Sequence, residues 1–398
     1  MVLVVIGCSG RPPTVELPDG GEQEVDAGVP LDSGTSDGGL DAGAPDAGTS
    51  DAGTSDAGAP DAGAPDAGGP PFLIEGFGAG TLGGWQTGSS SFLVTNLNDD
   101  GPGSLREACR TMGAPRVVTF ALDGRIALLT PIKLPSNISL DGTGRDIGVS
   151  GKGFHVHGES HVILTHFAIE GVGPNSEDGI QIGFPNLPPA HHVVLDHVRF
   201  AQTGTNGDSA NVDEAVSVIF GAHSITIAWC RFVNWEKAIL AGNGDADASI
   251  DGNISLTLHH NLFDNTGRRH PRARYGRFDV FNNFLYRWHA YDWFYLAPYR
   301  DSYGSWCQND CQMRLENNVY ERVAGLKDVG TKADDASRCD LGGRIVESGR
   351  FVTAASTAPL QFSAGCPLGA AVFARPYPAT IEPADALLGA RLFAQTGN

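Results

Sequence analysis

Apolar and polar residues alternate along short segments that recur through the chain from about residue 72 onward. Three of these segments end at Ile169, Phe200 and Phe232, so the repeat is 31 and then 32 residues long. Alternation with a period of two is typical of β-strands that bury one face. Further copies of the pattern occupy residues 254–263, 278–286 and 313–320.

The recurring strands are expected to stack as a coil. No amphipathic helix pattern separates the copies, which excludes a doubly wound sheet because parallel strands there are joined by crossover helices. The sequence therefore predicts an all-β fold, a right-handed parallel β-helix over residues 72–398 with short capping helices. A capping box at Ser104 and Glu107 predicts one such helix, and residues 382–393 predict another.

Asparagines recur where the predicted strands end. Pairs stand at Asn282-Asn283 and Asn317-Asn318, and Asn261 occupies an earlier turn. Asparagine tolerates left-handed backbone, and its amide can join a stacked ladder of hydrogen bonds. We interpret these asparagines as structural.

Composition divides the chain into unlike parts. Residues 1–71 contain 13 acidic residues and one arginine, so they carry most of the net charge of −19. Residues 9–71 are dominated by Asp-Ala-Gly units separated by Ala-Pro or Thr-Ser. Such small residues cannot bury enough apolar surface to offset the cost of ordering the chain, so a disordered linker is predicted.

The first eight residues are apolar and end in Val-Ile-Gly-Cys8, which resembles the end of a bacterial lipoprotein signal. No Lys or Arg precedes them, so either the true start lies upstream or Cys8 is incidental. We predict lipidation of Cys8 and a secreted or cell-surface protein. No run approaches the ~18 apolar residues that cross a bilayer, so contact with a membrane is expected only through this anchor. The net negative charge argues against a nucleic-acid partner, and we expect a monomer.

Six further cysteines make disulfides plausible in an exported chain, although the sequence leaves their pairing open. Cys307 and Cys311 could form a zinc half-site, yet no second pair follows at zinc-site spacing. A local disulfide is therefore the better prediction. Cys230 lies in an alternating strand and is interpreted as a buried thiol.

Several motifs occur in a fixed order along the predicted coil. They are the glycine-rich stretch 76–84, the stretch 94–107, the strand end Leu195-Asp196-His197, and the block 258–276 followed by Val280-Phe-Asn-Asn283. Together they resemble the pectate lyase superfamily, polysaccharide lyase family 1, from about Gly76 to the C-terminus. We interpret Asp196 and His197 as a structural hydrogen-bonding pair.

This resemblance implies cleavage of polygalacturonate, or pectate, by β-elimination to 4,5-unsaturated products. The C5 proton of a uronate is weakly acidic, so the enzyme must neutralise the adjacent carboxylate and place a base near C5. The family pattern implies that Arg269 is the catalytic base, although arginine in water stays protonated above pH 12. It also implies substrate binding by Arg272 and Lys237, and we include Arg274 in that set. The alternative reading of these arginines is an ordinary polyanion-binding patch.

The resemblance further implies calcium, a hard cation that prefers oxygen ligands. The matching positions are Asp178, Asp213 and Ser217, the last standing where the family usually has a second aspartate. A hydroxyl is a weaker ligand, so calcium is expected to bind weakly or only together with substrate carboxylates. Glu214 adjoins Asp213 and is expected to point to the opposite strand face.

An aromatic-rich segment follows the arginine block, and its Trp288 and Trp293 are candidate sugar-stacking residues. Core packing explains such a segment nearly as well. Two alternatives to a pectate lyase stay open. One is a pectin lyase acting on methyl esters, and the other is a non-catalytic β-helix protein that binds polyuronate at a surface.

Overall fold

The structure is a computed structural model that describes residues 69–110, 115–173, 178–202, 213–289, 302–324 and 334–397. Cys8, the signal-like segment and nearly all of the predicted linker lie outside the described residues, as does Trp293. Among the residues described, no helix combines the length and the apolar character needed to cross a membrane.

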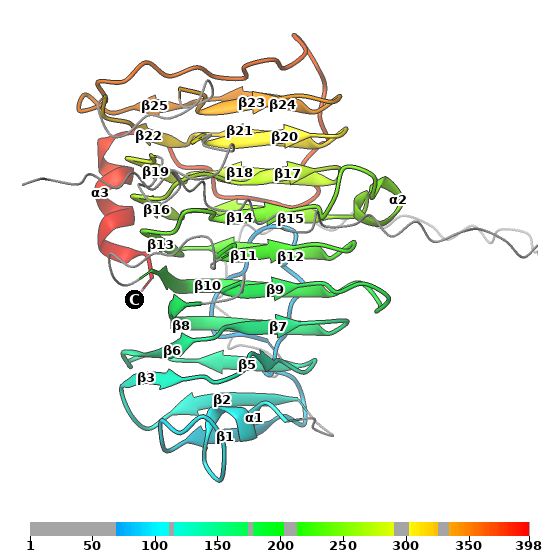
Figure 1. Cartoon of the computed structure of the whole chain (residues 1–398), viewed down its shortest axis with the longest axis vertical. Helices are drawn as coiled ribbons and strands as arrows, with labels where there is room; N and C mark the ends of the chain where they lie inside the picture. The colour runs from blue at the N-terminus through cyan, green and yellow to red at the C-terminus, as the bar shows by residue number, and fades with distance from the viewer. Residues whose placement is uncertain are drawn as a thin grey trace, which may run out of the picture. The chain divides into compact units, whose positions relative to one another are not determined.

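Two sheets of parallel strands wind together as a parallel β-helix, which confirms the predicted fold (Figure 1). The larger sheet consists of β1 (Ser90–Val94), β2 (Arg116–Phe120), β3 (Gly124–Ala127), β5 (Ile138–Asp141), β6 (Ile147–Gly151), β8 (Ser160–Val172), β10 (His191–Ala201), β12 (His223–Ala228), β13 (Arg231–Val233), β15 (Ser255–His259), β16 (Leu262–Asp264), β18 (Arg277–Phe281), β19 (Phe284–Tyr286), β21 (Gln312–Glu316), β22 (Val319–Glu321), β24 (Arg344–Ser348) and β25 (Phe351–Val352). The smaller sheet consists of β4 (Ile132–Lys133), β7 (Phe154–Val156), β9 (Ile180–Ile182), β11 (Val216–Val218), β14 (Ile239–Ala241), β17 (Arg272–Arg274), β20 (Ser305–Gln308) and β23 (Ser337–Cys339).

The core runs along the coil interior as ladders of equivalent side chains. Phe200 stacks on Phe232 with ring centroids 4.9 Å apart, and Phe232 stacks on Phe263 at 4.8 Å. All three rings are fully buried. The sequence repeat produces these ladders because each turn presents the same strand position to the turn above it.

The asparagines form the predicted ladder. The Asn283 side-chain oxygen accepts hydrogen bonds from the backbone N–H of Asn261, at 3.0 Å, and from its side-chain amide, at 2.9 Å. The Asn318 side-chain oxygen likewise accepts from the backbone N–H of Asn283, at 2.9 Å, and from its side-chain amide, at 3.1 Å. Asn282 and Asn317 have φ of +53° and +50°, the left-handed backbone that the bend requires. The structural interpretation of these residues is confirmed.

Helices occupy both ends of the chain's described part. The helix α1 (Leu105–Ala108) has the predicted cap, with the Glu107 N–H donating to Ser104 Oγ at 3.2 Å. The helix α3 (Ala386–Gln395) packs Leu388 and Leu392 against the larger sheet and begins later than predicted. Asp385 caps it, accepting from the Leu388 N–H at 2.8 Å, and Glu382 lies outside it, its carbonyl accepting hydrogen bonds from the side-chain amides of Asn282 and Asn317. A short helix, α2 (Ala248–Asp251), interrupts a loop between β14 and β15.

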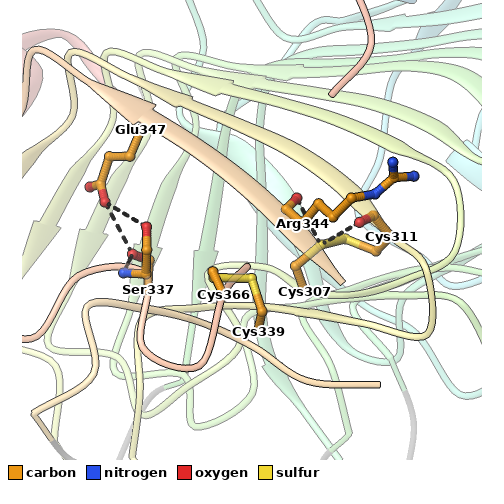
Figure 2. Close-up of a disulfide and its surroundings, with 8 residues drawn as sticks. Cys307, Cys311, Ser337, Cys339, Arg344, Glu347 and Cys366 are labelled. Carbon is orange, nitrogen blue, oxygen red and sulfur yellow. Dashed lines mark hydrogen bonds between the residues drawn. A yellow bond between two sulfur atoms is a disulfide. The ribbon is translucent and has the colours of Figure 1, made fainter. Parts of the chain in front are cut away.

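The cysteines pair near the C-terminal end of the coil. Cys307 bonds to Cys311, as predicted, and Cys339 bonds to Cys366 (Figure 2). Cys307 and Cys339 are register partners on β20 and β23, so the two disulfides lie on adjacent turns. A cross-link that spans 27 residues stabilises the fold by about 3–4 kcal/mol in the chain-entropy model. Cys230 is a buried free thiol, as interpreted.

Candidate active site

The predicted site residues gather just before the strands of the smaller sheet. Strands β9, β11 and β14 pair in register at Ile180, Val216 and Ile239. Two positions earlier on the same turns lie Asp178, Glu214 and Lys237. The next turn continues this column, because Lys237 forms a backbone bridge with Arg268, the neighbour of Arg269. Adjacent turns are about 4.8 Å apart, so side chains distant in sequence come into contact.

Three carboxylates meet in this column. Ligand oxygens of Asp178, Asp213 and Glu214 all lie within 4.8 Å of one another. The Glu214 N–H also donates to Asp178 Oδ1 at 3.0 Å. The prediction that Glu214 faces away from the site is wrong, because residues 213 and 214 precede β11 and the strand's alternation of faces does not extend to them.

Ser217 also belongs to this cluster, since its side chain hydrogen-bonds to Asp178. Burial and the neighbouring Asp213 carboxylate raise the pKa of Asp178 to about 7. The bond from Ser217 and the charges of Lys237 and Arg269 act in the opposite direction on this pKa but do not cancel the increase. The three predicted metal ligands, Asp178, Asp213 and Ser217, therefore lie close together, and Glu214 is a fourth residue of the cluster.

Two cations contact the carboxylates. Lys237 Nζ lies 2.5 Å from Asp213 Oδ1, and Arg269 forms an ion pair with Glu214, which is only 3% exposed. Arg269 has a φ of +68°, a left-handed backbone that a non-glycine residue adopts only at a cost. The structure thus brings together Lys237, Arg269 and the acidic cluster, as the sequence predicts.

Arg272 extends the site onto β17. Its Nε donates to Gln308 Oε1 at 2.8 Å, and its guanidinium lies 4.9 Å from the centroid of the Trp306 ring. Burial lowers the pKa of Arg272, and the charges of Arg274 and Arg269 lower it further. Sequence reasoning missed Gln308 and Trp306. Trp306 is the register partner of Arg272 on the next turn, so aligning β17 with β20 could have found it.

Two predicted substrate contacts are corrected. Arg274 is only 8% exposed, and its guanidinium bonds to Asp245 at 2.6 Å and to the Gly242 carbonyl at 3.1 Å. It therefore holds the loop after β14 instead of facing substrate. Trp288 is fully buried within the hydrophobic core, so it presents no ring face to a sugar.

Asp196 and His197 lie elsewhere, on β10 in the larger sheet. His197 Nδ1 is 2.7 Å from Asp196 Oδ2, and the His197 ring stacks on His166 with centroids 4.6 Å apart. The structural interpretation of this pair is confirmed. It belongs to a stack of side chains between turns and takes no part in the candidate site.

Comparison with known proteins agrees with this architecture. A family model described as pectate lyase matches residues 119–367, more than half of the chain. The chain belongs to the pectate lyase family. It is similar to the probable pectate lyase P56 of Solanum lycopersicum, with 28% identity over 239 residues that cover 54% of this chain and 56% of the relative. It is also similar to pectate lyase E of Dickeya chrysanthemi, with 31% identity over 169 residues, 38% of this chain and 42% of that one.

Solved structures share the fold. One described as a pectate lyase bound to hexasaccharide has a TM-score of 0.64 and 19% identity, and the match covers 84% of this chain and 99% of the other. The crystal structure of jun a 1, the major allergen from cedar pollen, has a TM-score of 0.63 and 20% identity, covering 81% and 92%. By contrast, the chain spans little more than half the length of the curated relatives it matches first.

Proposed function

We propose that this protein is a polysaccharide lyase that cleaves polygalacturonate by β-elimination. The observation that carries this proposal is the convergence of Lys237 and Arg269 with three carboxylates in one column of the coil. The cations suit a polymer that carries a carboxylate on every sugar, and the carboxylates suit a divalent cation. Glycoside hydrolysis fits less well, because it uses a pair of carboxyl groups without such basic partners.

The acidic cluster fits calcium. Calcium takes 6–8 oxygen ligands at about 2.3–2.6 Å, and oxygens closer together than 4.8 Å can share one ion of that size. Asp178, Asp213 and Glu214 would hold it, with Ser217 supporting Asp178. Bound there beside a uronate carboxylate, calcium would supply charge neutralisation that acidifies the neighbouring C5 proton.

The chain's own cations would perform the remaining tasks. Lys237 and Arg272 would bind substrate carboxylates and orient the sugar, since both guanidinium and ammonium groups donate to carboxylate oxygens. Once it has lost a proton to solvent, Arg269 would accept the C5 proton. The electrons of the C5–H bond would form the C4–C5 double bond, and the glycosidic oxygen would leave with the electrons of its bond to C4 and take a proton from water. The ion pair of Arg269 with Glu214 stabilises the charged guanidinium, so this role requires Glu214 to leave the pair when substrate and cation bind.

That same ion pair favours one second candidate, a non-catalytic polyuronate-binding protein. If the ion pair between Glu214 and Arg269 persists, Lys237 and Arg272 still bind substrate carboxylates, but Arg269 cannot act as the base. Sugar binding by the full chain without formation of a double bond would support this candidate over the lyase.

The test is ultraviolet detection of the 4,5-unsaturated product when the full chain is incubated with polygalacturonate. We expect product with added calcium, loss of product with a chelator, and no product from Arg269→Ala. Arg110→Ala is the matched control, because Arg110 is an exposed arginine that pairs with Asp100, away from the candidate site. Parallel assays on highly methylated pectin distinguish a pectin lyase. Absence of product under every condition would refute the proposal.

We further propose that the protein acts outside the cytoplasm as a monomer, anchored by lipid on Cys8. Mass spectrometry of the N-terminal peptide from the native host would detect the lipid, and sedimentation would give the oligomeric state. A chain with an unmodified Cys8 in the membrane-free fraction would contradict the anchor.

A further inference from the structure

A cleft of about 370 Å³ opens on the outer side of the larger sheet, away from the column of site residues. Its walls include Arg125, Arg145, Arg199 and His166, and Ala168 lies among the residues that line it. The strands involved are β3, β6, β8 and β10 (Figure 1). Gly397, just beyond the end of α3, also lines the cleft. None of these residues belongs to the candidate active site.

The strand register explains why the surface is hollow here. Arg125 pairs with Gly148, Gly148 with Ala168, and Ala168 with Arg199. Gly148 and Ala168 therefore separate Arg125 from Arg199. The backbones of the two arginines are three turns apart, which is about 14 Å at the usual strand spacing. A longer side chain does not fit at Gly148, since an added Cβ would lie 2.7 Å from the Ala168 Cβ.

Among the residues that line the hollow, three are arginines and one, Asp146, is acidic. Arg125 bonds to Asp146 at 2.7 Å and to Glu170 at 2.8 Å, and Arg199 forms an ion pair with the same Glu170. Arg145 is exposed and makes no side-chain hydrogen bond or ion pair with any residue that the structure describes. Two guanidinium groups thus share two carboxylates, and the third, that of Arg145, has its donors available.

The crowding of cations is visible at Arg199. Burial lowers the pKa of Arg199, and the nearby guanidinium groups of Arg125 and Arg231 lower it further. An anion bound in the cleft would relieve this repulsion. His166 contributes a flat ring at the wall, held by the Thr165 hydroxyl 2.8 Å from its Nδ1. Burial lowers the pKa of His166, so the ring is neutral near pH 7.

We propose that this cleft is an accessory binding site for a uronic acid unit of a polysaccharide, separate from the candidate active site. Planar guanidinium groups match a carboxylate with paired hydrogen bonds. The volume is within the range of pockets for small organic molecules. A second binding site for the same polysaccharide raises the effective concentration of that polysaccharide at the active site. The choice of uronate as ligand rests on the proposed function.

The test measures binding of a short saturated oligogalacturonate to the full chain by calorimetry, with chelator present and in a Lys237→Ala background that weakens the active site. Arg145→Glu should raise the dissociation constant by about tenfold, as expected for loss of one charge-assisted hydrogen bond. The matched control Arg110→Glu should leave it unchanged, and circular dichroism should show both variants folded. Inorganic phosphate serves as the competing anion.

Equal binding by the Arg145→Glu and Arg110→Glu variants would overturn the proposal. So would binding of phosphate with no binding of the oligosaccharide, which would make the cleft a simple anion site. Turnover is measured separately with Lys237 intact: Arg145→Glu should weaken action on long polymer and leave kcat on a short oligomer unchanged. If no turnover occurs but Arg145-dependent sugar binding persists, the lyase proposal fails and the accessory site stands.

Discussion

His270 is expected to make the protein sensitive to acid. This residue stands between Arg269 and Pro271 in the arginine block and is fully buried. Its Nε2 lies 2.7 Å from the Thr266 hydroxyl, and its Nδ1 lies 3.0 Å from the Tyr303 carbonyl oxygen. The imidazole therefore supports the backbone that carries Arg269. Burial lowers the pKa of His270 from its usual 6.5 to about 4.

The sign of the pH effect follows from linkage. Between pH 6.5 and 4 the unfolded chain binds a proton at this histidine and the folded chain does not, so the free energy of unfolding falls as the pH falls. From pH 7 to pH 5, these two pKa values give a loss of about 2 kcal/mol from His270 alone. Burial also lowers the pKa of His157 and His192 to about 4, so these histidines act in the same direction, whereas the raised pKa of Asp178 acts in the opposite direction.

The contribution of His270 is isolated by comparison with His270→Gln, which keeps polar atoms but does not titrate. Urea unfolding of both proteins at pH 7 and pH 5 gives four free energies. The wild-type chain should lose about 2 kcal/mol more than the variant on acidification, although the variant is less stable at both pH values. Equal losses in the two proteins would refute the reasoning that His270 is held neutral by burial.

Three further predictions concern the site and the ladder. Glu214→Gln should lower the free energy of unfolding by about 3 kcal/mol, because it leaves the Arg269 cation buried without its partner; urea unfolding checks this, and a change below about 1 kcal/mol contradicts it. Ser217→Asp should tighten calcium binding by adding an ionised ligand, as measured by calorimetry, whereas Ser217→Ala should not. Asn283→Ala should cost about 2–3 kcal/mol, since the buried N–H and side-chain amide of Asn261 lose their acceptor; an exposed control, Asn98→Ala, should be nearly neutral.

Much of the fold was predictable from the sequence. The period-two segments repeating at 31 and 32 residues correspond to β8, β10 and the strands that follow them. The paired asparagines marked the bends, and Ser104 with Glu107 marked α1. The start of α3 was missed because the cap was missed: Asp385 is the N-cap, and its side chain accepts a hydrogen bond from the Leu388 N–H at 2.8 Å. That signal was present in the sequence.

The candidate site was only partly predictable. The family pattern pointed to Asp178, Lys237 and Arg269, which the structure brings together. Glu214 was misassigned because alternation of faces holds only within a strand. Arg274 looked like a substrate contact until its pairing with Asp245 was visible.

The sequence by itself determined the strand repeat, the bends and the kinds of charged groups that each turn supplies. Only the tertiary structure decided which charges pair, because partners such as Arg269 and Glu214 lie on neighbouring turns and meet only when the coil stacks. The same stacking left Arg145 beside a hollow floored by small residues. Sequence patterns describe one turn at a time, whereas burial and electrostatic energy depend on what the next turn places within a few ångströms.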